Sequence, residues 1–339
     1  MTVAFADVAA LEVALNRLPV MDRAALAAAR TRQAELTKPE GSLGRLEDIA
    51  VFMAGWQATA RPRIEQVRAV VFAGNHGVAA RGVSAFPVEV TAQMVGNFGA
   101  GGAAINALAA SCGAELAVVA LDLDRPTQDI TAGPAMTADE CLAALNAGAA
   151  SVPAGCDLLF VGEMGIGNTT PAAALCAQAY GGSAARWCGR GSGVDNGGVA
   201  RKVAAVDAAL TLHGKACTTA FETLRRMGGR EIAAMAGAIL AARLRRVPVL
   251  LDGYICCAAI APIVAANPAF TDHCLAAHCS AEAAHARLLG LFELEPLLNL
   301  GMRLGEASGA AVAVHLVRAA LAVHNQMATF AQAAVAQAG

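Results

Sequence analysis

The chain has 339 residues, a formal net charge of −2, 4% aromatic residues and no basic block, which argues against a nucleic-acid-binding surface. The longest apolar run, residues 247–270, is interrupted by Asp252, Asn267 and three prolines, and the N-terminus lacks a basic region, so neither a membrane span nor a signal peptide is expected. We therefore expect a cytoplasmic protein with one large domain or a large and a small one, and the sparse charge suggests that a partner subunit covers part of its surface.

Both ends of the chain are predicted to be helical. Helical periodicity runs through residues 4–31, and another helix follows the turn within residues 37–50. The tail, roughly residues 306–337, is also helical and rich in alanine. Because neither end holds a strand, we expect residues 1–60 and 307–339 to pack together as one small helical domain.

Between these ends, strands and helices alternate. Six apolar runs are predicted strands: 67–73, 116–121, 158–161, 185–188, 247–251 and 274–278. Predicted helices cover residues 87–98, 103–110, 138–150, 199–212, 218–226, 231–245 and 256–265. This alternation is typical of βαβ units, so residues 61–306 are expected to form an α/β domain with a mainly parallel sheet.

Small or polar clusters stand at the ends of five of these strands. They read GNHG, GEMG, GRGSG, LDG and HCS in chain order. Because the carboxyl ends of parallel strands lie at one edge of a sheet, these clusters are expected to line a single crevice.

The most informative cluster lies in VGEMGIGNTTP, residues 161–171. The apolar run is predicted to break at Gly162 and Glu163, with Thr170 as N-cap and Pro171 as the first helical residue. A strand, a glycine-rich loop and a helix N-terminus in this order present backbone N–H groups to an anion. The loop matches neither the dinucleotide fingerprint nor the P-loop, so an ordinary turn remains the alternative, although the acid at the strand end favours a ligand site.

Glu306 is the second candidate. It stands in GEASG, residues 305–309, where small neighbours leave space for a flat ligand. Desolvation there would raise the pKa of this carboxyl toward the range of a general base. The alternative is a first-turn helical residue that the helix dipole favours.

Other polar residues keep two interpretations each. His76 follows the first strand and either acts in catalysis or caps backbone groups. Arg201 and Lys202 follow a glycine-rich stretch and either neutralise a phosphate or are solvated charges. The run HCLAAHC, residues 273–279, matches no structural zinc spacing, so no metal is expected, and the ten cysteines are expected to be reduced.

The motifs occur together in one order, as TKPEGSLGRLE, GNHG, GEMGIGNTTPAAA, VPVLLDGY, AHCSAE and EPLLNLGMRLGEASGAA. This set, over about residues 36–330, resembles the nicotinate-nucleotide–dimethylbenzimidazole phosphoribosyltransferases of cobalamin (vitamin B12) biosynthesis. The resemblance implies a Rossmann-like domain over residues 61–306 and a small helical domain from residues 1–60 and 307–339. It also implies a homodimer in which the neighbouring subunit helps to close each active site.

The family transfers phosphoribose from nicotinate mononucleotide to 5,6-dimethylbenzimidazole. The products are α-ribazole 5′-phosphate and nicotinate, with inversion at the anomeric carbon and without a metal or other cofactor. Carried onto this chain, the resemblance makes Glu306 the catalytic residue, a general base that takes a proton from one benzimidazole nitrogen while the other attacks the ribose. Ala307 replaces a glycine of the family motif, a small change that we expect to be tolerated.

The resemblance also implies the binding residues. The nucleotide and its phosphate are expected to bind Glu163, Gly165, Ile166, Gly167, Asn168, Thr169, Thr170, Gly191, Lys202, Ser280 and Gly305. The base is expected to lie against Phe86, Met94 and Leu304. Because some members have a serine and a glutamine near the positions of Phe86 and Met94, the anchoring of the base and the preferred base are expected to differ. A nucleotide-dependent hydrolase or kinase, and a nucleotide-binding sensor, are the rival functions.

Overall fold

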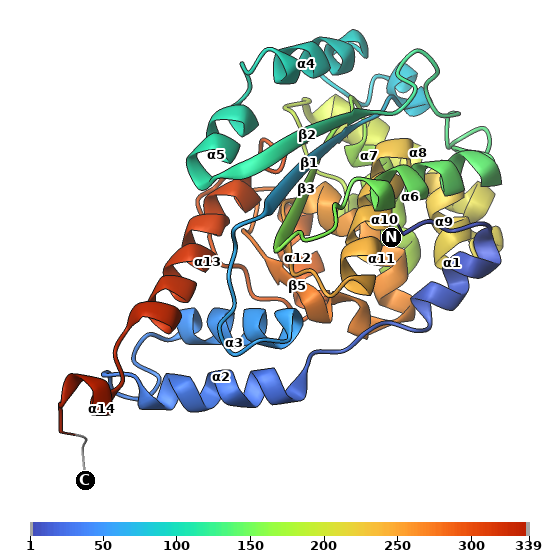
Figure 1. Ribbon diagram of the computed structural model, residues 1–339. Helices are drawn as coiled ribbons and strands as arrows, with labels where there is room; N and C mark the ends of the chain where they lie inside the picture. Colours follow the sequence, from blue (N-terminus) through green and yellow to red (C-terminus); the bar gives the residue numbers. More distant parts are fainter. Residues whose placement is uncertain (1–2, 337–339) are drawn as a thin grey trace.

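The sheet is the centre of the molecule, which a computed structural model describes over residues 3–336 (Figure 1). Its five strands are β1 (Val67–Ala73), β2 (Ala114–Ala120), β3 (Leu158–Met164), β4 (Val249–Leu251) and β5 (Cys274–Ala276). They pair in the order β2-β1-β3-β4-β5, and every pairing is parallel. The predicted α/β class with a parallel sheet is therefore confirmed, and the chain reverses its winding between β1 and β3, where ligands of such sheets bind.

Helices connect the strands and cover both faces of the sheet (Figure 1). They are α4 (Glu89–Gly99), α5 (Ala104–Cys112), α6 (Ala138–Ala150), α7 (Thr169–Tyr180), α8 (Asn196–His213), α9 (Ala220–Met227), α10 (Arg230–Leu244), α11 (Tyr254–Ala266) and α12 (Ala283–Leu291). Short 3-10 turns occupy Gly77–Arg81, Ala184–Arg186, Gly214–Ala216 and Pro268–His273.

Alternating side chains of the strands fill two separate cores. In β1, Val70 and Phe72 join the core formed with α6, α7, α10 and α11, whereas Ala69 and Val71 join the core on the opposite face. This period of two is the geometry of a strand buried on both faces, which explains why the sequence of β1 is an almost unbroken apolar run.

The two ends of the chain meet beside the sheet. They supply α2 (Arg23–Glu35), α3 (Arg45–Gln57), α13 (Ser308–Gln326) and the short α14 (Phe330–Ala333). Arg32 donates from Nε to the carbonyl oxygen of His324 at 2.6 Å, and Gln33 Nε2 lies 2.9 Å from the Nδ1 atom of His324. The predicted end of the tail at Gln337 lies outside the described residues.

The first helix, α1 (Val8–Leu15), lies apart from this group (Figure 1). The backbone N–H of Phe5 donates to Asn146 Oδ1 in α6 at 2.7 Å, and Leu11 joins the core around α10. The division into residues 1–60 with 307–339 and residues 61–306 stays a prediction, and these contacts attach residues 5–15 to the sheet domain.

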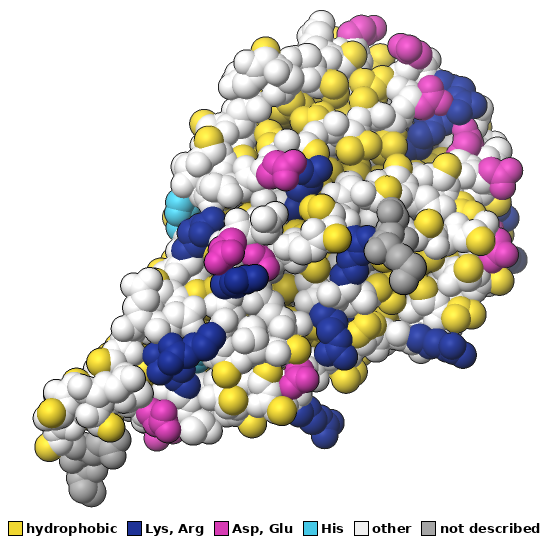
Figure 2. Space-filling view, in the orientation of Figure 1, with side chains coloured by type: hydrophobic (Ala, Val, Ile, Leu, Met, Phe, Trp, Pro, Cys, Tyr) yellow, Lys and Arg dark blue, Asp and Glu magenta, His cyan; other side chains and the backbone are white. Residues whose placement is uncertain are grey.

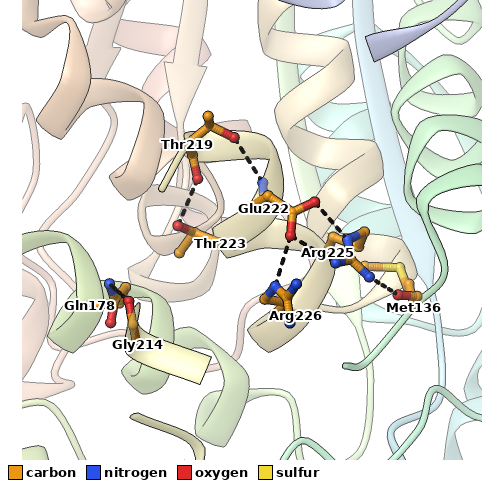
Figure 3. Close-up of polar contacts among 8 residues, drawn as sticks. All are labelled: Met136, Gln178, Gly214, Thr219, Glu222, Thr223, Arg225 and Arg226. Carbon is orange, nitrogen blue, oxygen red and sulfur yellow. Dashed lines mark hydrogen bonds and ion pairs between the residues drawn. The ribbon is translucent and has the colours of Figure 1, made fainter. Parts of the chain in front are cut away.

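A polar network holds the long connection between β2 and α6. Figure 3 shows Glu222 of α9 between Arg225 and Arg226, to which it pairs at 2.7 Å each, while Thr219 caps the helix. Arg225 donates from Nη1 to the carbonyl oxygen of Met136, and the backbone N–H of Met136 donates to the Arg225 carbonyl in return. This reciprocal contact fixes the turn-rich segment just before α6.

Several local predictions are wrong, and the tail predicted as one helix over residues 306–337 is interrupted between α13 and α14. Residues 185–188 form no strand: Ala184–Arg186 make a 3-10 turn, because the buried Trp187 donates from Nε1 to the carbonyl oxygen of Gly181. The third strand continues to Met164, since Gly162 and Glu163 pair with β1. Thr170 is not the N-cap of α7, which begins at Thr169 after Asn168.

Among the described residues, no helix is both long and apolar enough to cross a membrane.

Candidate active site

A pocket of about 410 Å³ opens at the carboxyl edge of the sheet. Its walls come from the end of β3, the loop into α7, the residues that follow β4 and β5, and the segment before α13. All predicted site residues line this pocket except Thr170, which is fully buried. Residues of four of the five predicted clusters therefore line one crevice, although GRGSG follows no strand, and GNHG does not line it.

The loop after β3 is tied to the strand that precedes it. Asn168 donates from Nδ2 to Glu163 Oε2 at 2.5 Å. The backbone N–H of Ile166 donates to Thr91 Oγ1 at 3.2 Å, and that of Asn168 donates to the Gly165 carbonyl at 3.1 Å. Two of the N–H groups that were expected to face a phosphate are thus engaged within the protein.

Lys202 supplies a buried positive charge beside this loop. Its Nζ donates to Thr169 Oγ1 at 2.8 Å and to the Gly189 carbonyl at 3.2 Å, and the residue is only 2% exposed. Burial lowers the pKa of this ammonium, because the charged form is poorly solvated. An ammonium at the N-terminal end of α7 and facing a pocket is suited to an anionic ligand.

Glu163 lies deep in the pocket among other acids. Burial raises the pKa of its carboxyl to about 8, and the negative charges of Glu231, Asp252 and Glu306 act in the same direction, against the hydrogen bond from Asn168. Because three acids of the cluster line one pocket, Glu163, Asp252 and Glu306, their ionisation is coupled. A pKa raised in this way favours the protonated form of Glu163 at neutral pH.

Asp252 directly follows β4 and accepts a hydrogen bond from the backbone of α13. Its Oδ1 lies 2.9 Å from the Ala310 nitrogen and 3.6 Å from His278 Nε2. Burial raises the pKa of Asp252 to about 7, although the N–H groups at the start of α13 oppose this shift. Burial lowers the pKa of His278, so a neutral imidazole lies beside this carboxyl.

Glu306 stands in a backbone turn with left-handed φ angles. Gly305, Glu306 and Ala307 have φ values of 82°, 59° and 65°. Such a conformation costs a non-glycine residue about 1–3 kcal/mol and persists only where the surroundings fix it. A Cβ on Gly305 would overlap the Glu163 carboxylate, so only glycine fits there.

The Glu306 carboxyl is a buried acid of the pocket with an unpaired oxygen among the described residues. The residue is 6% exposed, and among the described residues its Oε2 atom has no hydrogen-bond partner. Burial raises the pKa of Glu306 above its usual range. A carboxylate that is desolvated, unpartnered and open to a pocket is able to accept a proton from a ligand.

Ser280 is fixed by a histidine behind the pocket. His285 accepts the backbone N–H of Ser280 at its Nδ1 atom at 2.9 Å, and its Nε2 faces Cys257 Sγ at 3.4 Å. The Ser280 hydroxyl lies 3.0 Å from the same Nδ1 atom. Since Nδ1 accepts, Nε2 carries the ring proton, and burial lowers the pKa of His285 to about 3.

The predicted base pocket forms the rim of the cavity. Phe86 and Leu304 are 50% and 55% exposed, and Met94 of α4 packs against the core on that side of the sheet. The pocket also contains Asp252, His278 and Glu282, for which the sequence predicted no individual role. Asp252 belongs to LDG and His278 to HCS, two of the clusters that were predicted to line the crevice. Among residues 3–336, no group of three or more His, Cys, Asp or Glu side chains is arranged to hold a metal ion.

His76 lies behind the pocket instead of in it. Its Nε2 is 2.6 Å from Glu231 Oε1, and both side chains are almost completely buried. Glycine at position 165 leaves room for this pair, because a Cβ there would lie 2.9 Å from Glu231 Oε1. The His76 side chain makes no capping bond to the helical turn that follows it and instead forms a buried pair with Glu231.

The fold and the pocket together define an α/β protein with an acid-rich site at the carboxyl edge of its parallel sheet. A family model described as "Phosphoribosyltransferase" matches residues 18–335. Proteins named nicotinate-nucleotide–dimethylbenzimidazole phosphoribosyltransferase are similar over 98% of both chains, with 68% identity in Novosphingobium aromaticivorans and 56% in Ruegeria pomeroyi. The chain belongs to this phosphoribosyltransferase family, and it is a glycosyltransferase-type enzyme.

Solved structures agree with this family. The crystal structure of CobT from Thermus thermophilus is 38% identical to the chain, with a TM-score of 0.86 over 93% of this chain and 100% of that one. A second structure from the same organism, described as the phosphoribosyltransferase, is 37% identical with the same TM-score and covers 94% of this chain.

Proposed function

We propose that the enzyme transfers phosphoribose from nicotinate mononucleotide to 5,6-dimethylbenzimidazole and releases α-ribazole 5′-phosphate and nicotinate. The names of its relatives support this pair of substrates. The observation that carries the proposal is the Glu306 carboxyl, which is buried and has no partner at Oε2 within residues 3–336, in the same pocket as the loop before α7 and the buried Lys202.

The two walls of the pocket have different roles, one in binding the nucleotide and the other in binding the base. On one wall, Lys202 and the loop of residues 165–169 hold the 5′-phosphate of the nucleotide. On the other, Phe86, Met94 and Leu304 hold the flat base. Glu306 accepts the N–H proton of the base, the second ring nitrogen forms its bond to the anomeric carbon, and the bond to nicotinate breaks with inversion.

We further infer that the enzyme serves cobalamin nucleotide-loop assembly as a cytoplasmic homodimer. The exposed apolar side chains of Phe86 and Leu304 at the pocket rim favour a neighbouring subunit there. Figure 2 shows hydrophobic side chains gathered on the face over β2, the edge strand, whose residues are mostly half-buried. Sedimentation analysis of the purified enzyme tests the dimer.

One assay separates the proposed reaction from its rivals. The enzyme is incubated with nicotinate mononucleotide and dimethylbenzimidazole in the presence of a metal chelator, and both products are quantified by chromatography. The proposal requires equal amounts of nicotinate and α-ribazole 5′-phosphate. A hydrolase would release nicotinate and ribose phosphate without the base, and a sensor would bind the nucleotide and release nothing.

A further inference from the structure

Helix α13 has no capping side chain of its own. Its N-cap residue is Ala307, which offers no side-chain acceptor to the N–H groups of the first turn. Asp252, which directly follows β4, accepts the Ala310 N–H at 2.9 Å, and the backbone N–H groups of Gly309 and Ala307 also favour its charged form. A residue distant in sequence thereby takes the place of the N-cap, at the helix end that favours an anion.

The turn that Asp252 holds is the one that carries Glu306. Three successive residues, 305–307, have left-handed φ values, and two of them are not glycine. The turn fits closely against its surroundings: a Cβ on Gly162 of β3 would overlap the Ala307 nitrogen, and a Cβ on Gly309 would overlap the His278 ring. The direction of the Glu306 side chain depends on this backbone conformation.

We propose that Asp252 is a positioning residue that holds the strained turn of residues 305–307 and so aims the Glu306 carboxylate at the base. The inference rests on the proposed role of Glu306 as general base. Asp252 is unsuited to that role itself, because helix N–H groups occupy its carboxylate, whereas Glu306 Oε2 has no partner among the described residues. Asp252 therefore acts through the backbone and leaves the proton transfer to Glu306.

The first test is D252N, which keeps the size of the side chain and removes the anion. We expect kcat to fall at least 10-fold while KM for nicotinate mononucleotide changes less than 3-fold, because Lys202 and the loop before α7 are untouched. The matched control is D22N. Asp22 also caps a helix, with Oδ1 accepting the Ala25 N–H at 2.8 Å, but it lies outside the pocket, so its kcat is expected to stay at the parental value.

The second test is rescue by A307G, which lets residue 307 adopt its left-handed conformation without the cost that a Cβ adds. We expect the D252N A307G variant to recover at least 3-fold in kcat over D252N. We also expect the two changes to be non-additive in urea unfolding, with a smaller loss of midpoint from D252N in the A307G background. A parental kcat in D252N, or a D252N loss that A307G does not relieve, would overturn the proposal.

Two further outcomes separate a failure of the Asp252 proposal from a failure of the general-base role of Glu306. If E306Q, assayed in parallel, retains parental turnover, the general-base role fails, yet the urea coupling between residues 252 and 307 still reports whether Asp252 holds the turn. If D252N alone does not fold, a folded and active D252N A307G variant supports the proposal. A double variant that also fails to fold contradicts it, since Asp252 would then serve the fold as a whole.

Discussion

Asn168 donates from Nδ2 to Glu163 Oε2 at 2.5 Å, and this bond joins the loop before α7 to the end of β3. The other carboxylate oxygen of Glu163 lies against Gly305, where no side chain fits. Glu163 therefore bridges the loop on one wall of the pocket and the Glu306 turn on the other. A change in the charge of Glu163 therefore acts on both the loop before α7 and the turn that carries Glu306.

The buried acids predict an unusual pH dependence of stability. Folding raises the pKa of Glu163 from 4.5 to about 8, so the folded chain binds this proton more tightly than the unfolded chain does. The contribution of Glu163 to the free energy of unfolding is largest below pH 4.5. It decreases as the pH rises toward 8, by at most about 1.4 kcal/mol per pH unit. Asp252 acts likewise between pH 3.8 and about 7.

Glu163→Gln removes one of these titrations. We expect the stability of this variant relative to the parent to increase as pH is raised from 5 to 8, as measured by urea unfolding at several pH values. The control is Glu295→Gln, whose side chain is 78% exposed and whose stability is expected to follow the parent. Parallel pH profiles of Glu163→Gln and the parent would show that Glu163 is ionised in the folded protein.

Lys202→Gln tests the phosphate wall. Because charge-assisted hydrogen bonds contribute about 1.5–3 kcal/mol, loss of the ammonium is expected to raise KM for nicotinate mononucleotide about 10- to 100-fold. Steady-state kinetics with varied nucleotide measures this change. Lys215→Gln, at an exposed lysine outside the pocket, is the control, and an unchanged KM in Lys202→Gln would remove Lys202 from the nucleotide site.

Phe86 and Met94 predict a preference for apolar bases. We expect Phe86→Ser and Met94→Gln, combined, to raise kcat/KM for adenine relative to dimethylbenzimidazole about 10-fold, since an unpaired polar group in an apolar pocket costs about 1–3 kcal/mol. Competition assays with dimethylbenzimidazole, adenine, phenol and cresol measure the ratio. Ratios equal to those of the parent would place the base elsewhere.

His76→Ala tests the buried pair behind the loop. It leaves the Glu231 carboxylate without its partner at 2.6 Å, in a position with no exposed surface. Loss of one partner of a buried pair costs about 3–5 kcal/mol, which urea unfolding measures directly. His315→Ala, at an exposed histidine of α13, is expected to change stability little, and equal effects of the two variants would argue against the pair as a stabilising contact.

Elements with strong local signals were predictable from the sequence. The strand at Val67–Ala73 is an apolar run that ends at a glycine, and it was predicted with the bounds that the structure has. The helix at Ala138–Ala150 begins after Thr137, whose side chain and that of Glu140 form a capping box, and its bounds also match. In both cases the signal lies within a few residues.

Features that depend on distant residues were not predictable. The helix at Ala283–Leu291 was missed, and its N-cap residue, Glu282, makes no capping bond. The contact of Asp252 with Ala310 joins residues 58 positions apart, and that of His76 with Glu231 joins residues 155 apart. A single sequence carries no local trace of such pairs, so the supports of the site emerge only from the tertiary structure.

The most direct measurement of the proposed mechanism is the turnover of Glu306→Gln with nicotinate mononucleotide and dimethylbenzimidazole, with nucleotide affinity measured by calorimetry. The amide has nearly the same shape but cannot accept the proton, so we expect kcat to fall about 10²- to 10⁴-fold while the nucleotide still binds with parental affinity. A Glu306→Gln enzyme that forms α-ribazole 5′-phosphate at the parental rate would contradict the role of Glu306 as general base.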